Sequence, residues 1–416
     1  MLKTIIKFPN GVELSSGAGT GDAIQSVTIT ECVNDSRELA PGSTCASILE
    51  AKILTPAGEV YLNSGDELTV YTENEMGQRE SVGLFIAEKP VRSSANSISL
   101  TAFDRIIKLD KDVATWLNNL TGWPYSLINF AKMVCTQCGL TLTTTAIPNG
   151  DYMVQQFSAQ SVTGRRLIQW VGQIAGRFCR ATPDGNVEFA WYTAANKAIT
   201  PDGDNFYYQN GLTYEDYSVA KIEKVQLKLT ADDNGVVWPD VSGKKNTYVI
   251  TGNYLLTTSS TENLQPIAET LYEQLKGITY TPCKVTLPAN SGIRAGHTVQ
   301  VTDRNGKTFT SYIMTRTRTG QRETVESTGS QRRDSTTAVN EESYKAMSGQ
   351  LLEIKKDVEG LVVTASKITS IEVGGRNLIR NSINLLYKDY YFVESGDTST
   401  AIAGKAVAGL AIVGKG

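Results

Sequence analysis

Residues 26–53 read SVTITECVNDSRELAPGSTCASILEAKI and contain two strand-like segments on either side of a turn. The segments 26–30 and 47–54 are rich in β-branched and apolar residues, which suit a half-buried pleated surface. Pro41-Gly42 lies between them and is typical of a turn. This stretch therefore predicts two strands joined by a loop.

More short strands are predicted around this pair, at residues 5–8, 68–71, 82–87 and 97–102. Turn residues such as Asn10-Gly11 separate them, and short strands with this turn chemistry favour a barrel or a sandwich.

The period of the apolar residues changes after residue 105. Residues 125–139 and 161–174 carry apolar side chains at helical spacing, and the first of these segments ends at a glycine. A hairpin is predicted over 177–191, with its turn at Pro183-Asp184-Gly185. These elements predict a small α/β unit.

Residues 214–335 return mainly to strand-like patterns, with one helix predicted over 263–276. The stretch from Arg322 to Asn340 is polar, and we interpret it as a linker. Arg316, Arg318, Arg322, Arg332 and Arg333 lie in a mildly basic stretch without interleaved aromatic residues. That pattern favours a solvated strand face and linker over a nucleic-acid site.

A heptad pattern follows the linker and predicts a coiled-coil seam, because an isolated helix would leave it exposed. Its members are Met347, Leu351, Ile354, Val358, Leu361, Ala365 and Ile368. An amphipathic helix packed on its own domain is the alternative. Gly349 and Gly360 weaken both helical interpretations, and residues 362–364 would also suit a strand.

Composition excludes several classes of protein. The 416 residues are 40% hydrophobic and 20% charged with a net charge of -3, which excludes wholesale disorder and gives no strong attraction to nucleic acid or anionic lipid. No apolar stretch approaches the roughly 20 residues that span a bilayer. The N-terminus has no apolar signal segment, so we expect synthesis and folding in the cytoplasm.

Few residues are candidates for chemistry. His297 is the one histidine, and no GxSxG or HExxH motif is present. Cys135 and Cys138 form a CxxC at the end of a predicted helix, on its apolar side, where buried structural cysteines are expected rather than a redox or zinc site. We therefore expect no enzymatic activity, no metal and no cofactor.

Several segments resemble one known family. FPNGVEL (8–14), residues 26–53, SGDELTVY (64–71) and GLFIAEKPVRSSANSISLTAFDRI (83–106) are similar to the N-terminal region of phage tail-tip or baseplate hub proteins. This family is the tail-associated proteins of phages and phage-like particles of Gram-positive bacteria. Residues 166–175 and 291–301 resemble later segments of that family. A sharper resemblance, to receptor- or carbohydrate-facing modules of tail proteins, lies in GGRNLIRNS (374–382). Its motif residues are Gly374, Gly375, Arg376, Asn377, Leu378 and Asn381.

The resemblance implies a mainly β fold with an α+β insert. The implied parts are tube-like β-barrel regions at 1–105 and 205–335, the second with one helix, an α/β insert at 106–204, a linker and coiled coil at 336–373, and the start of a receptor- or carbohydrate-facing module at 374–416.

The implied role is structural. Hubs of this family are homotrimers that cap the tail tube, connect it to host-attachment proteins and take part in DNA ejection. The expected partners are the chain itself, tail-tube proteins and other baseplate or receptor-binding proteins, with a tape-measure protein as a further candidate. The expected location is the virion tail, after assembly in the host cytoplasm. A tail-associated cell-wall hydrolase and a host-surface adhesin acting through the C-terminal segment are the alternatives.

Overall fold

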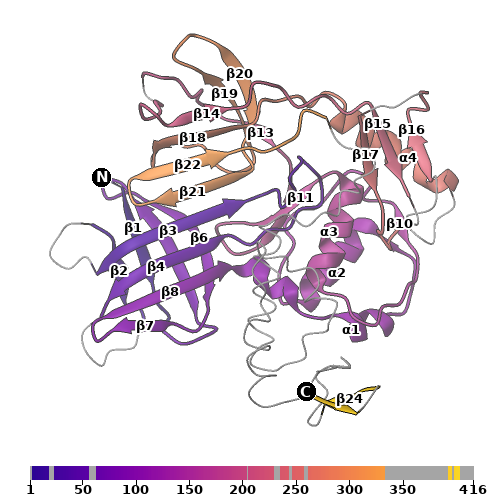
Figure 1. The fold of residues 1–416 in the computed structure, drawn as a ribbon, viewed down its shortest axis with the longest axis horizontal. Coiled ribbons are helices and arrows are strands. Elements are labelled where there is room, and N and C mark those ends of the chain that lie inside the picture. The colour runs from indigo at the N-terminus through magenta and orange to yellow at the C-terminus, as the bar shows by residue number, and fades with distance from the viewer. Residues whose placement is uncertain are drawn as a thin grey trace. The chain divides into compact units, whose positions relative to one another are not determined.

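The computed structural model describes residues 2–17, 23–55, 62–203, 205–228, 235–242, 246–256 and 261–332, and the backbone of residues 392–395 and 398–402. The chain divides into two compact units, residues 1–351 and residues 352–416. The second contains an antiparallel hairpin of β23 (Phe392–Ser395) and β24 (Thr398–Ile402). Strands dominate the first unit (Figure 1), so the predicted mainly β fold is confirmed.

Twelve strands of the first unit form one sheet, in the order β14-β18-β22-β21-β3-β4-β8-β6-β5-β1-β2, with β7 paired to β8. The N-terminal strands are β1 (Lys3–Lys7), β2 (Glu13–Ser15), β3 (Ile24–Cys32), β4 (Ile48–Leu54), β5 (Glu67–Glu73), β6 (Arg79–Ala87), β7 (Val91–Ser94) and β8 (Ser97–Asp104). The later strands are β14 (Leu212–Tyr214), β18 (Cys283–Pro288), β21 (Thr315–Thr319) and β22 (Arg322–Glu326).

The pairing of β21 with β3 joins the two ends of the first unit into this sheet. The strands run antiparallel, from Thr315 opposite Cys32 to Thr319 opposite Thr28, and Figure 1 shows orange β21 beside indigo β3. Among the described strands, the hydrogen-bonded order of this sheet ends at β14 on one side and at β2 on the other. The expected barrels are therefore wrong in that the described strands form no closed barrel. The outer edge of β3 pairs with β21, and an isolated bridge between Ser16 and Ile24 links the end of β2 to the start of β3.

Alternating side chains explain the core beneath the N-terminal strands. In β4, Leu49, Ala51 and Ile53 are buried, whereas Glu50 and Lys52 are exposed, as period-two alternation requires. The buried residues join apolar side chains of β1, β3, β5, β6 and β8 in one cluster. A separate apolar cluster lies under the C-terminal strands and includes residues of β18, β19, β20 and β22.

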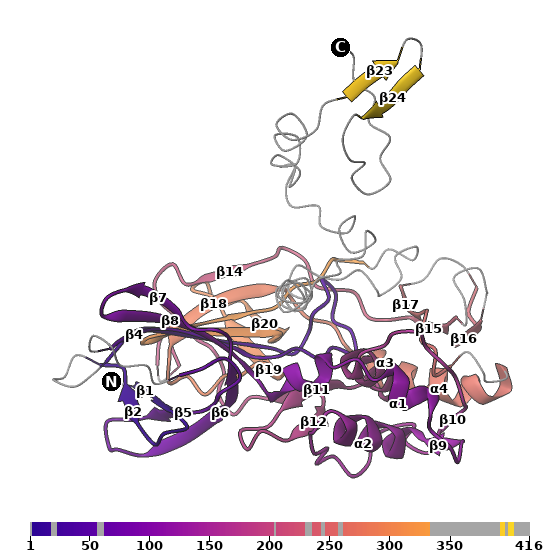
Figure 2. The same ribbon diagram turned by 90° about the horizontal axis from the view of Figure 1, so that it is seen from below.

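Helices gather at the end of the unit away from the N-terminal strands (Figure 2). They are a 3-10 helix η1 (Arg105–Asp110), α1 (Ala114–Asn118), α2 (Leu127–Gln137), α3 (Gly164–Ala175) and α4 (Thr261–Leu275). Helix α3 begins where the Thr163 hydroxyl accepts the Arg166 N–H, and it ends at Gly176, whose positive φ of 63° suits glycine. The helices predicted over 125–139, 161–174 and 263–276 are confirmed.

Smaller sheets accompany the helices and the C-terminal strands. They contain β9 (Tyr125–Ser126), β10 (Met153–Val154), β11 (Phe178–Ala181), β12 (Val187–Ala190), β13 (Thr193–Ala194), β15 (Lys224–Leu227), β16 (Val236–Trp238), β17 (Thr247–Ile250), β19 (His297–Thr302) and β20 (Thr308–Tyr312). Helix α4 and the sheet β16-β15-β17 share the largest apolar cluster with α2 and α3. Among the described helices, none is long and apolar enough to cross a membrane.

The start of the expected linker belongs to the sheet. Arg322–Glu326 is strand β22, which pairs with both β18 and β21. Beyond it, the Tyr280 hydroxyl donates to the Thr328 carbonyl at 2.7 Å, and the Tyr217 hydroxyl donates to the Gly329 carbonyl at 2.9 Å. The linker interpretation is thus wrong for residues 322–331, because alternating burial in β22 places Glu323 and Val325 inside.

Candidate functional site

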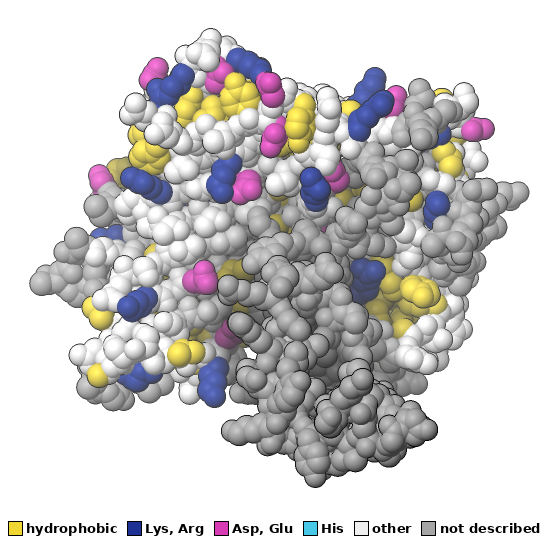
Figure 3. All heavy atoms as spheres, viewed as in Figure 1, with side chains coloured by type: hydrophobic (Ala, Val, Ile, Leu, Met, Phe, Trp, Pro, Cys, Tyr) yellow, Lys and Arg dark blue, Asp and Glu magenta, His cyan; other side chains and the backbone are white. Residues whose placement is uncertain are grey.

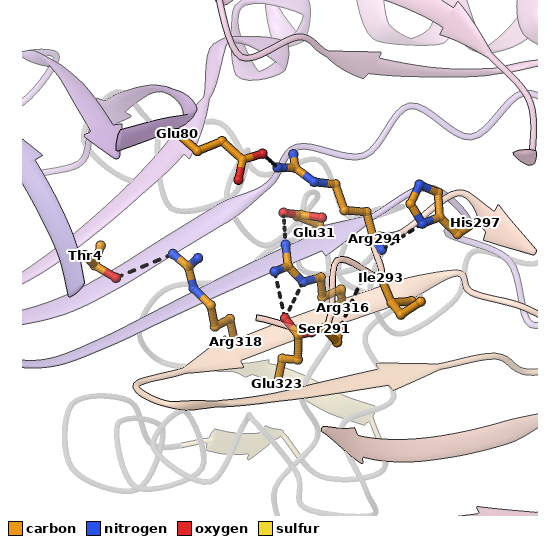
Figure 4. A network of polar contacts seen from close by, with 10 residues as sticks. All are labelled: Thr4, Glu31, Glu80, Ser291, Ile293, Arg294, His297, Arg316, Arg318 and Glu323. Atoms are coloured by element: carbon orange, nitrogen blue, oxygen red, sulfur yellow. Dashed lines mark hydrogen bonds and ion pairs between the residues drawn. The ribbon is translucent and has the colours of Figure 1, made fainter. Parts of the chain in front are cut away.

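A group of buried charged side chains lies where β3, β21 and β22 meet (Figure 4). Strand β21 reads Thr-Arg-Thr-Arg-Thr, so its two arginines face the same side of the sheet. Arg316 is 8% exposed and Arg318 is 6% exposed. We call Glu31, Ser291, Arg316, Arg318 and Glu323 the buried charge network.

Arg316 is the centre of this network. Its Nε and Nη2 donate to Oε2 of Glu323 at 2.9 and 2.7 Å, and its Nη1 donates to Oε1 of Glu31 at 2.9 Å. The Ser291 hydroxyl donates to the other oxygen of Glu323, which is 1% exposed. One guanidinium therefore connects a strand from the beginning of the chain to a strand from its C-terminal part.

Glu31, Arg316 and Arg318 are all ionised at neutral pH. Burial favours the protonated form of Glu31, but the positive charges of Arg316, Arg294 and Arg318 outweigh it and lower the pKa of this carboxyl. Burial alone would lower the pKa of Arg316, and the two carboxylates beside it raise that pKa instead. Burial, together with the charge of Arg316, lowers the pKa of Arg318 to about 10, which leaves it protonated at neutral pH.

Further contacts extend from the network to the N-terminal strands. Nη2 of Arg318 lies 3.5 Å from the Thr4 hydroxyl of β1. Arg294, in the loop before β19, forms an ion pair with Glu80 of β6. Its backbone N–H donates to Nδ1 of His297 at 3.2 Å, and burial together with Arg180 and Arg294 lowers the pKa of His297.

Both carboxylates of the network accept hydrogen bonds from Arg316, and Oε1 of Glu323 also accepts the Ser291 hydroxyl. Each of these carboxylates is therefore paired with a cation. Truncating one partner of such a buried pair typically costs about 3–5 kcal/mol, since the other charge stays buried. In the described part of the chain, no group of three His, Cys, Asp or Glu side chains is placed to hold a metal ion.

The sequence interpretation missed this network. Arg316 and Arg318 were expected on a solvated strand face, and that expectation is wrong, because the face they share is covered by neighbouring elements. The strict alternation of Thr and Arg at 315–319 was the available signal for a strand. It could not identify which face is buried.

The two cysteines of the CxxC motif are buried, as predicted. Cys135 and Cys138 are buried on the apolar side of α2 and its C-terminal cap. Burial raises the pKa of Cys135 to about 12 and that of Cys138 to about 11, which disfavours the reactive thiolate.

The two sets of residues predicted from the C-terminal sequence lie outside the described residues. They are the seam, Met347, Leu351, Ile354, Val358, Leu361, Ala365 and Ile368, and the motif, Gly374, Gly375, Arg376, Asn377, Leu378 and Asn381. Both remain predictions.

Several solved structures are similar to this chain. The tail protein from Neisseria meningitidis MC58 matches it with a TM-score of 0.51 at 12% identity, over 82% of this chain and 99% of that one. The 43 kDa tail protein of prophage MuSo2 from Shewanella oneidensis matches at a TM-score of 0.48 and 12% identity, over 78% and 96% of the two chains. The prophage tail protein gp18 from Listeria monocytogenes EGD-e matches at 0.48 and 12%, over 85% and 99%. No family model matches the sequence, and no curated protein does.

The fold is thus similar to that of the tail protein from Neisseria meningitidis. The resemblance seen in the sequence is confirmed at the level of fold.

Proposed function

We propose that the protein is the structural hub at the tip or baseplate of a phage tail or a phage-derived injection particle. Three copies cap the tail tube and connect it to distal, host-contacting proteins. The observation that carries this proposal is the fold shared with the tail protein of Neisseria meningitidis along 99% of that chain.

The architecture of the first unit supports a structural role. One sheet contains strands from Lys3 to Glu326, so segments from both ends of the first unit share one hydrogen-bonded sheet. The buried charge network crosses the junction between its N-terminal and C-terminal strands.

Immunogold labelling of the parent particle tests the location. Antibodies against residues 1–332 should label the tail tip and leave the capsid and the tube wall unlabelled. Labelling along the whole tube would contradict a hub and favour a tube subunit. A peptidoglycan zymogram of the purified chain tests the hydrolase alternative, and clearing there would replace the structural role with an enzymatic one.

A further inference from the structure

One end of the twelve-stranded sheet has an open edge. Strand β14 pairs with β18, and none of the described strands pairs with its other side. The Gly211 carbonyl accepts from Thr286 N–H, and Glu215 N–H donates to the Pro282 carbonyl. Because hydrogen bonding alternates along an antiparallel strand, the backbone groups of Leu212 and Tyr214 point away from β18. This edge can accept another strand.

Aromatic side chains accompany this edge. Tyr207 is 3% exposed and packs in the C-terminal core, whereas the next-door Phe206 is 39% exposed. The rings of Phe206 and Tyr208 lie 5.9 Å apart, and Tyr214 of β14 lies 4.8 Å from Phe309 of β20. In the same part of the molecule, at the upper left of Figure 3, hydrophobic side chains lie among charged ones.

Three cations lie over these rings. The Arg304 guanidinium is 5.3 Å from the centre of Tyr207, and Lys307 Nζ is 4.9 Å from that of Tyr214. Both come from the turn between β19 and β20. Arg322, at the start of β22, lies 4.8 Å from the ring centre of Tyr208. All three cationic residues are exposed.

Other stacked cations of the chain differ from these three. Arg79, Arg180 and Lys276 each lie over an aromatic ring and also pair with a carboxylate. Arg304, Lys307 and Arg322 have a ring but no ion pair within the described residues. Arg166 on α3 shares this property, and it lies over Trp170, far along the chain from the edge.

The acid in the same turn does not neutralise these cations by direct contact. Asp303 accepts the Tyr214 hydroxyl at 2.8 Å and the N–H groups of Asn305 and Lys307, each at 2.8 Å. The oxygens of Asp303 therefore accept hydrogen bonds from within the turn and from Tyr214.

A guanidinium held on a ring keeps its in-plane N–H groups free and has already lost part of its side-chain entropy. Both properties favour binding of a carboxylate from another molecule.

We propose that this edge binds an extended, acidic segment of another protein, which adds beside β14 as a further strand. Side chains of an extended segment alternate between two faces. The cations near this edge come from two elements, Arg304 and Lys307 from the turn between β19 and β20 and Arg322 from the start of β22. Carboxylates of the segment would thus meet these cations, while its backbone pairs with Leu212 and Tyr214.

The first test measures binding of synthetic peptides to the full chain by fluorescence anisotropy. One labelled peptide repeats Thr-Thr-Glu-Glu, which places carboxylates on both faces, and the other repeats Thr-Thr-Gln-Gln. At low salt the Glu peptide should bind at least about tenfold more tightly, and high salt should remove this difference. Equal affinities, or no binding of the Glu peptide at millimolar concentration, would overturn the proposal.

Variants locate the binding. The triple variant Arg304→Gln, Lys307→Gln, Arg322→Gln should lose the preference for the Glu peptide. Lys276→Gln is the matched control, because Lys276 is stacked on Tyr272 but already paired with Glu273, and it should bind like the wild type. An unchanged preference in the triple variant would refute the site.

Hydrogen exchange provides a readout that does not depend on a variant folding. The amides of Leu212 and Tyr214 in the wild-type chain should exchange more slowly when the Glu peptide is bound. Protection confined to other strands would contradict addition at β14. None of these outcomes depends on where the protein lies in a particle, so the hub proposal and this one can fail separately.

Discussion

Arg316 and Glu31 are separated by 285 positions in the sequence, yet Nη1 of the arginine lies 2.9 Å from Oε1 of the glutamate. The contact crosses the paired strands β21 and β3, where Arg316 stands directly opposite Glu31. Because both side chains are largely buried, this pair and the Arg316–Glu323 pair should govern how firmly the two ends of the first unit hold together.

Arg316→Met should destabilise the protein strongly. It leaves Glu31 and Glu323 buried without their cation, which should lower the free energy of unfolding by about 3–5 kcal/mol in urea titrations. Lys284→Met is the control, because Lys284 is exposed and lies 3.6 Å from Glu326, and it should cost less than about 1 kcal/mol. Equal losses in the two variants would contradict a stabilising network.

Because of Asp104, the free energy of unfolding should decrease as the pH rises. Its carboxylate accepts N–H groups of Ser47 and Ile106 at 2.8 and 3.0 Å, but burial outweighs these bonds and raises its pKa from 3.8 to about 6. The native state therefore binds the proton more tightly than the unfolded chain. The resulting stabilisation, roughly 3 kcal/mol, is present below pH 4 and is lost as pH rises through about 6.

Asp104→Asn isolates this effect, because asparagine keeps an acceptor oxygen and does not titrate. The free energy of unfolding of the wild type minus that of the variant should decrease between pH 4 and 7. A difference that is flat with pH, or that increases, would show that Asp104 is not protonated preferentially in the native state.

Cys135 and Cys138 should react slowly in the native protein. Burial raises both thiol pKa values, so iodoacetamide at pH 8 should modify them only after urea is added, and metal analysis should find no stoichiometric zinc. Rapid modification of the folded protein, or one zinc ion per chain, would disprove a structural role for this pair.

A chain that ends at Ser335 should fold without the C-terminal segment. It retains β22 and the contacts of Tyr217 and Tyr280 with residues 328 and 329. Urea unfolding followed by far-UV circular dichroism should stay cooperative. A chain that ends at Gln321 is the control, and it should aggregate or unfold without cooperativity, because it lacks β22 and its buried Glu323. The prediction fails if the longer chain behaves in the same way.

The heptad seam predicts a stalk that reinforces a trimer. Ile354→Asp with Leu361→Asp would place charge in two layers of a packed seam, which is costly. We expect light scattering to give a trimer for the wild type and for this double variant, with only the C-terminal stalk loosened. A wild-type monomer or dimer would refute the trimer, and dissociation of the double variant would show that the seam holds the copies together.

Local patterns in the sequence were sufficient for several parts of this structure. The one-sided apolar spacing of Leu127, Ala131 and Val134 determines helix α2, and it also predicts that the adjoining cysteines are buried. Alternation in Ile48–Leu54 likewise determines which side chains of β4 enter the core. Each pattern repeats over neighbouring residues, so burial of one face follows from the chain alone.

The tertiary structure decided where the charged residues of β21 lie. The sequence Thr315–Thr319 alternates, but both sets of side chains are polar, so its pattern does not distinguish an inner face from an outer one. Pairing with β3 and β22 buries Arg316, and its carboxylates come from positions 31 and 323. Strand register between such distant segments depends on the whole packed core, and for that reason the open sheet and its buried charges became visible only in the folded chain.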